Sequence, residues 1–351
     1  MLKDDVLKKY FQIAIIQENN RPVAICNHRI SHNYEFFFAD GEYYTQVNKE
    51  LEEKLRKTYR FDGSPINTIQ ISNMFGDIKY TIKDAIKESA NSIMAFAEDL
   101  PLATKIKISS RINTLKFITE KEYKKNFGDL PVFFTAAYHS KHHIIFASAR
   151  NLLTDRVLEH EMLHAASRNE NEAYSGLQQF DIIYQIMIGR GLNEAATDFF
   201  ARYISNKEQS HPIIRLLIDC FGKLIEMCDI KKIKEYYFNS DYFGFVNYLS
   251  QFYHLDLDDI TQTVLTFDAL YNSFYSLYET DRNRKKIALE LYKNIIGMQM
   301  NKLKAEGQSL EDYTFESDIL NKKENFKLKI EIDKFVTEQK LEISIPKVIE
   351  L

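Results

Sequence analysis

The chain has 351 residues, of which 45% are hydrophobic and 27% charged, a balance typical of a globular protein with more than one packed unit. Its formal net charge is −4 and both signs are mixed along the sequence, so it lacks the basic field that nucleic-acid binding needs. No stretch has the roughly 18 uncharged apolar residues of a membrane helix, and the N-terminus lacks a secretory signal pattern. These features predict a cytoplasmic protein with no nucleic-acid or membrane partner. They leave the oligomeric state and signal-independent export open.

The first 80 residues are predicted to form a small β-rich α+β unit. Segments rich in β-branched and aromatic residues cover 11–17, 22–30 and 34–44, with turn-prone residues at 18–20 and at Asp40–Gly41. A polar helix is expected over 45–59 and a further strand over 66–71.

Residues 81–207 are predicted to form a second domain of helices around a short mixed sheet. Helices are expected over 84–100 and 155–166, and a third from an N-cap at Asn193 to Ser205. Residues 105–109 alternate like a strand, and 132–137 and 143–148 are expected to pair around a polar turn at 139–141. A glycine-containing stretch covers 175–191.

Residues 208–351 are predicted to form a helical lobe. Apolar residues recur at helical spacing from Pro212 onward, and 281–306 reads as one long amphipathic helix. The tail, 326–346, alternates apolar and polar residues like a closing hairpin. The three cysteines, Cys26, Cys220 and Cys228, have no regular spacing, which favours free thiols.

One helical segment carries the pattern His-Glu-x-x-His at residues 160–164. Residues four apart on a helix face the same way, so His160 and His164 are expected to present two imidazole nitrogens to one metal ion. Glu161 points about 100° away from His160, beside the ion, where it can reach a metal-bound water. Two imidazoles plus a carboxylate leave a fourth position open, as in a catalytic zinc site rather than a structural one. The alternative is a chance pattern on a surface helix.

A second segment, thirty residues later, offers two carboxylates on one helix face. Glu194 and Asp198 are four residues apart, so both can point at the same place. A site of this kind needs a third ligand and a carboxylate that orients a ligating histidine, and this helix provides both. The alternative is a capped helix with two solvated acids.

Together, HEMLH and NEAATD resemble the gluzincin metallopeptidases, the clan that includes thermolysin. The resemblance covers about residues 132–205, and the longer strings HEMLHAAS and GLNEAATDFFARY are similar to uncharacterised bacterial proteins of the clan. It implies that His160, His164 and Glu194 bind zinc, that Glu161 is the general base and that Asp198 supports His160. The resemblance implies a zincin-like core over 81–207. With the β-rich unit of 1–80 and the helical lobe of 208–351 read from the residue patterns, the expected fold is α+β.

The chain departs from two patterns found among related zinc peptidases. The Gly-x-Met-Glu-Asn signature of gluzincin aminopeptidases is absent, because residues 73–76 read Asn-Met-Phe-Gly, which argues against aminopeptidase activity. A third histidine soon after the second is also absent, because the next histidine after His164 is His211.

The resemblance also implies groups that would contact substrate. His142 and His143 adjoin a predicted edge strand of the kind that binds substrate backbone in this clan, so either could contact substrate. Polar residues at the start of a strand are the favoured explanation of both. A donor to the developing oxyanion is expected from Tyr184, Tyr253 or His254.

The sequence therefore predicts a peptidase with one zinc ion per chain and a peptide or protein substrate. Glu161 would act as general base on a zinc-bound water, with endopeptidase cleavage expected. Two alternatives stay open. One is a non-catalytic protein that keeps zinc for folding, binding or scaffolding, and the other is a peptidase that processes its own chain.

Overall fold

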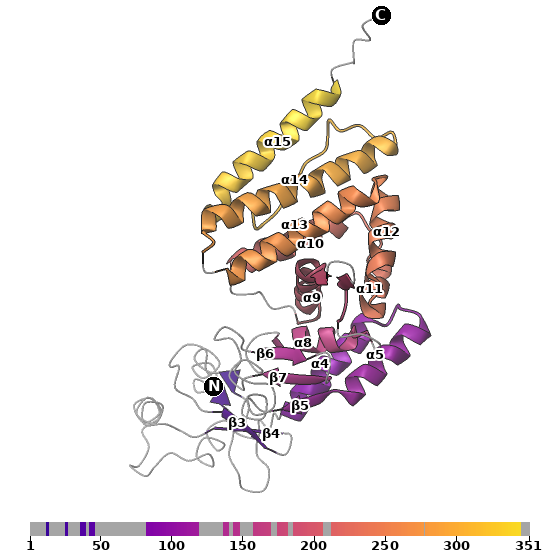
Figure 1. The fold of residues 1–351 in the computed structure, drawn as a ribbon, viewed down its shortest axis with the longest axis vertical. Coiled ribbons are helices and arrows are strands. Elements are labelled where there is room, and N and C mark those ends of the chain that lie inside the picture. Colours follow the sequence, from indigo (N-terminus) through magenta and orange to yellow (C-terminus); the bar gives the residue numbers. More distant parts are fainter. Residues whose placement is uncertain are drawn as a thin grey trace, which may run out of the picture. The chain divides into compact units, whose positions relative to one another are not determined.

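The structure, a computed structural model, describes residues 12–13, 25–26, 36–39, 42–45, 82–118, 136–139, 143–147, 157–169, 174–181, 185–205, 212–276 and 278–344 (Figure 1). The chain divides into two compact units, one formed by residues 1–166 and 201–207 and the other by residues 167–200 and 208–351.

Two short hairpins are found near the start of the chain. Strand β1 (Gln12–Ile13) pairs with β2 (Ile25–Cys26), and β3 (Phe36–Ala39) pairs with β4 (Glu42–Thr45), both antiparallel. These strands fall in the segments predicted to be rich in β structure. Thr45, the predicted start of a helix, is the last residue of β4; the rest of that helix, 46–59, and the strand predicted over 66–71 lie outside the described residues.

Two helices follow, and the second corrects a prediction. Helix α4 (Ile82–Phe96) matches the predicted helix closely, but residues 105–109 belong to α5 (Leu102–Thr114) and are not a strand. The buried residues of α5 are Thr104, Ile108 and Arg111, whose spacing of four and three marks one face of a helix. Ile106, which created the apparent alternation, is 59% exposed.

A three-stranded mixed sheet supports the first unit. Its order is β5 (Lys116–Ile118), β7 (Ile144–Ala147), β6 (Ala136–His139), with β5 parallel and β6 antiparallel to β7. The predicted antiparallel pairing is found, but β6 includes His139, which was assigned to the turn, and residues 132–135 lie outside the described part of the chain. Among the described strands, β6 lies at an edge of this sheet. Helix α8 (Val157–Ala166), close to its predicted bounds, packs against α4, α5, β6 and β7.

The glycine-containing stretch of the second unit holds a hairpin, β8 (Gln179–Asp181) with β9 (Ile186–Ile188). Helix α9 (Arg190–Ser205) then begins three residues before the predicted start. Asn193 is therefore not its N-cap. The Asn193 N–H donates to the Gly189 carbonyl at 2.8 Å, inside the helix, and the side-chain Oδ1 accepts from the Leu177 N–H at 2.9 Å.

Five helices form most of the second unit, as predicted for 212–306. They are α10 (Pro212–Ile225), α11 (Ile230–Asn239), α12 (Tyr242–Tyr253), α13 (Leu257–Tyr275) and α14 (Asp281–Ala305). Helix α14 packs against α10, α12 and α13, and α13 also contacts α10, α12 and β9. The largest fully buried side chains are aromatic: Phe200, Phe221, Tyr237, Phe238, Phe245, Tyr253, Phe267 and Tyr292.

The tail is a helix, which corrects the predicted hairpin. A 3-10 turn, η1 (Lys323–Asn325), leads into α15 (Phe326–Ser344), which packs against α14. Its buried residues Leu328, Ile332 and Val336 are spaced by four, whereas Ile330 is 49% exposed. The apolar side chains thus follow the helical period, and Ile330 lies off the buried face.

The described chain is therefore mostly helical with small sheets, an α+β composition. No helix among the described residues is long and apolar enough to cross a membrane.

Candidate metal centre

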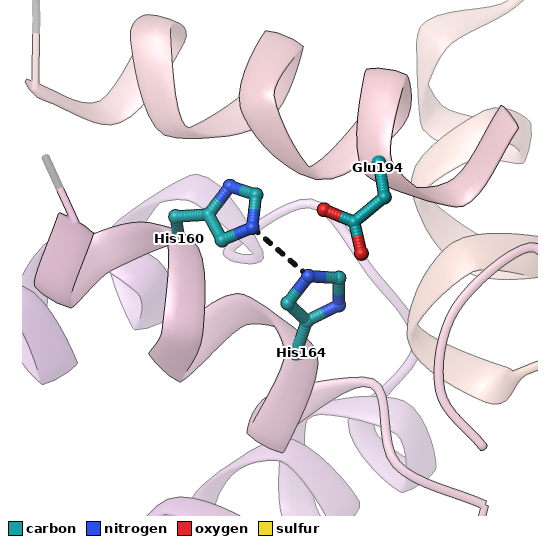
Figure 2. Close-up of side chains that lie close together, drawn as sticks. All are labelled: His160, His164 and Glu194. Carbon is teal, nitrogen blue, oxygen red and sulfur yellow. Dashed lines mark hydrogen bonds between the residues drawn. The ribbon is translucent and has the colours of Figure 1, made fainter. Parts of the chain in front are cut away.

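Helix α8 presents its two histidines on one face because its other faces are packed. Leu158, Met162 and Leu163 are each at most 2% exposed, so they fix how the helix is rotated. The Nε2 atoms of His160 and His164 then lie 3.0 Å apart, and the two rings meet edge to face (Figure 2). The predicted one-turn spacing therefore brings both imidazoles to the same point.

Glu194 of α9 completes a group that can hold a metal. One ligand atom each from His160, His164 and Glu194 lie within 4.8 Å of one another, and in Figure 2 the Glu194 carboxylate faces the two rings. Two ligands of a tetrahedral zinc are about 3.3 Å apart, given bonds of about 2.0–2.1 Å. The 3.0 Å between the histidine nitrogens is close to that value, and two imidazole nitrogens with a carboxylate are ligand types that zinc accepts.

Glu161 is buried next to the histidines and is held by the edge strand. Its side chain is 8% exposed, and its Oε2 accepts a hydrogen bond from the Tyr138 backbone N–H of β6 at 2.6 Å. A carboxylate held by a fixed backbone donor keeps a defined orientation. Glu159, the other acid of this helix, has a different hydrogen-bond partner: its carboxylate accepts from the Ser89 hydroxyl at 3.2 Å.

The His143 ring is held by partners on α5 and β6. The residue is 8% exposed, and its Nε2 lies 2.6 Å from the Arg111 carbonyl oxygen, an acceptor, so Nε2 carries the proton. The other nitrogen, Nδ1, lies 2.8 Å from the Tyr138 hydroxyl. The ring thereby joins the end of α5 to the edge strand, as expected if it serves the sheet rather than a substrate.

The start of α9 is anchored by Asp268 of α13. The Asp268 carboxylate accepts from the Gly189 N–H at 2.8 Å and from the Gly191 N–H at 2.6 Å. Burial raises the pKa of Asp268, and these backbone hydrogen bonds and the nearby Arg190 charge oppose the rise. At Gly191 the two helices approach so closely that an added Cβ would lie 2.2 Å from the Phe267 carbonyl oxygen. Glu194 lies one turn beyond this anchor.

Asp198 lies one turn beyond Glu194 on α9 and is 6% exposed. It is therefore not a solvated acid, which was the alternative interpretation of this residue. Its predicted support of His160 stays a prediction.

The remaining predicted residues have separate positions. Tyr184 and His142 lie outside the described residues. Tyr253 is fully buried and its hydroxyl donates to the Leu224 carbonyl. His254 is an exposed, left-handed C-cap of α12 whose carbonyl accepts from the Asn301 amide at 3.0 Å.

Two supports of the site were missed from the sequence. Asp268 lies 77 residues from Gly191, and Tyr237, which contacts Thr197 on α9, lies 40 residues from it. Neither belongs to a local pattern, so periodicity gives no signal for them. The short Gly189-Arg190-Gly191 segment was the one available hint that another backbone comes close.

Comparison of the chain with protein-family models found no match, and searches among curated proteins and solved structures found none either. The function proposed below therefore rests on the geometry of these residues together with the motif resemblance.

Proposed function

We propose that this protein is a zinc-dependent peptidase of the gluzincin type. The observation that carries the proposal is the convergence of His160, His164 and Glu194, with atoms within 4.8 Å, beside the buried and oriented carboxylate of Glu161. A zinc site that only stabilises a fold is closed by four protein ligands and needs no base. The order of the motifs along the chain and the mixed sheet next to α8 support a zincin-like core.

Each residue has a defined task in this proposal. His160, His164 and Glu194 would hold the ion, which when bound activates water and polarises the scissile carbonyl. Glu161 takes the proton from the attacking water and delivers it to the leaving nitrogen of the peptide. The Tyr138 N–H orients the Glu161 carboxylate for both transfers. A peptide or unfolded protein segment is the proposed substrate.

The test combines metal analysis and a cleavage assay on the wild-type protein and four variants. Purified protein is expected to contain one zinc per chain, and His160→Ala or Glu194→Ala should lose most of it. Glu161→Gln should keep the zinc but lose cleavage of a denatured protein, since an amide cannot accept the proton. Glu159→Gln is the matched control, because it removes the neighbouring acid of the same helix, which bonds to Ser89.

The outcomes separate the proposal from its alternatives. Equal cleavage by wild type and Glu161→Gln would contradict the catalytic role. Zinc without cleavage of any peptide in a mixed library would favour a non-catalytic zinc protein. Shortening of the chain itself on storage with zinc, absent in Glu161→Gln, would identify self-processing. Full zinc occupancy in Glu194→Ala would remove that residue from the site.

A further inference from the structure

A buried tyrosine on α11 lies against the helix that carries Glu194. The Tyr237 side chain is 0% exposed, and its hydroxyl oxygen lies 2.9 Å from Thr197 Oγ1. Thr197 Oγ1 donates its only proton to the Asn193 carbonyl at 2.8 Å. The proton between Thr197 and Tyr237 must therefore come from the tyrosine, which makes Tyr237 a donor to the middle of α9.

The Tyr237 hydroxyl also contacts Ser167, the residue that follows α8. Ser167 is fully buried directly after Ala166, and its side chain is hydrogen-bonded to Tyr237. Since the tyrosine proton points at Thr197, the Ser167 hydroxyl donates to the tyrosine oxygen. The Ser167 carbonyl is held as well, because it accepts from the Ser240 hydroxyl at the end of α11 and from the Gly176 N–H at 3.0 Å.

The two partners of Tyr237 have matching positions relative to the proposed ligands. Ser167 lies three residues after His164, and Thr197 lies three residues after Glu194. Residues three apart on a helix are neighbours on its surface, so a shift of Thr197 moves Glu194 with it.

The tyrosine keeps its proton in these surroundings. Burial raises the pKa of Tyr237 far above its ordinary value, and the charges of Glu194 and Asp198 raise it further, while the Thr197 and Ser167 hydrogen bonds oppose them. A neutral hydroxyl that both donates and accepts has a fixed direction. Edge-to-face contacts with Phe200 at 5.0 Å and Phe238 at 5.3 Å hold the ring itself.

We propose that Tyr237 is a positioning residue of the metal centre, which holds the middle of α9 through Thr197 and so fixes the position of Glu194. This inference rests on the proposed zinc site. It assigns Tyr237 no contact with metal or substrate. Loss of groups that orient metal ligands typically weakens binding by roughly 10- to 100-fold, and because Tyr237 acts through neighbouring residues we expect the lower end, about 10-fold.

The experiment compares Tyr237→Phe with Tyr292→Phe. Both tyrosines are fully buried and both changes remove one buried hydroxyl, but Tyr292 donates to Asp219 at 2.6 Å in another part of the helical unit. Zinc affinity is measured by competition with a chromophoric chelator, ligand geometry by the visible spectrum of the Co²⁺-substituted protein, and stability by thermal unfolding without metal. Tyr237→Phe should weaken zinc binding about 10-fold and change the cobalt spectrum. Tyr292→Phe should lower stability alone.

A second variant removes the other partner of the same contact. Thr197→Val keeps the shape of the side chain without its hydroxyl, so it should reproduce the loss of affinity and the changed spectrum even if Tyr237→Phe folds poorly. Wild-type affinity and spectrum in either folded variant would overturn the inference while leaving the zinc site intact. Absence of zinc and cobalt binding by the wild-type protein would instead overturn the proposed function, and the inference with it.

Discussion

Replacing Gly191 by alanine tests the anchor of α9, because two physical effects predict opposite changes in the free energy of unfolding. Gly191 lies inside the helix, where alanine is favoured over glycine by about 1 kcal/mol. The added Cβ, however, would lie 2.2 Å from the Phe267 carbonyl oxygen and 2.9 Å from the Asp268 Cα. These are backbone atoms of another helix, which cannot rotate away as the end of a side chain can.

The magnitude follows from the hydrogen bonds that the clash would break. Restoring a normal contact requires the two backbones to separate by about 1 Å. Such a shift would stretch the bonds of 2.8 and 2.6 Å that Asp268 accepts from Gly189 and Gly191 beyond hydrogen-bonding range. Bonds to a charged group contribute about 1.5–3 kcal/mol each, so about 3–6 kcal/mol is lost and about 1 kcal/mol regained. The net expectation is a destabilisation of about 2–5 kcal/mol.

Urea unfolding followed by far-UV circular dichroism measures this difference, with Gly297→Ala as the matched control. Gly297 also lies within a helix, α14, but nothing lies within 4 Å of its added Cβ. Gly297→Ala should therefore raise the unfolding midpoint, gaining about 0.5–1 kcal/mol, while Gly191→Ala lowers it. A rise in both midpoints would refute the close approach of α9 and α13.

Three further predictions concern the tail, a thiol and the metal centre. Ile332→Ala, at a fully buried position of α15, should cost about 2–5 kcal/mol, whereas Ile330→Ala, 49% exposed, should change stability by less than about 0.5 kcal/mol; equal losses would contradict a helix. Burial raises the pKa of Cys228 from 9.0 to about 11, so iodoacetamide should alkylate it about 100-fold more slowly at pH 8 in the native protein than in urea, as followed by peptide mass spectrometry. The stability from this shift is present below pH 9 and is lost as the pH rises through about 11, and equal alkylation rates would contradict the burial. Asp198→Asn should weaken zinc binding roughly 10- to 100-fold in the same chelator competition, and unchanged affinity would remove Asp198 from the support of His160.

Helices with long amphipathic faces were predictable from the sequence, and short alternating segments were not. Positions i and i+4 share a face in both a strand and a helix, so Leu328 and Ile332 fit either structure. The residue midway between them, Ile330, distinguishes the two structures. It is apolar, which completes the alternation typical of a strand, but it is exposed in the helix. Ile106 and Ile108 produced the same false strand pattern over 105–109, although the buried residues of α5 as a whole have helical spacing.

The candidate site was likewise predictable only where local spacing brings its residues together. His160, His164 and Glu194 were predictable because each helix turn places residues four apart together, and the motif resemblance joined the two segments. The groups that hold α9 come from distant parts of the chain. Asp268 and Tyr237 act through α13 and α11, and no local spacing relates them to α9.

The composition of α9 itself supports a functional interpretation of this helix. Asn193, Thr197 and Asp198 are all at most 6% exposed, on a helix whose remaining buried positions are apolar. Burying polar groups costs free energy unless they are hydrogen-bonded, and Asn193 and Thr197 have partners in Leu177 and Tyr237. Apolar residues would pack a helix of this length without such partners. A hydrogen-bonded buried polar network instead gives one defined arrangement, which the proposed site would need in order to hold Glu194 in a fixed position.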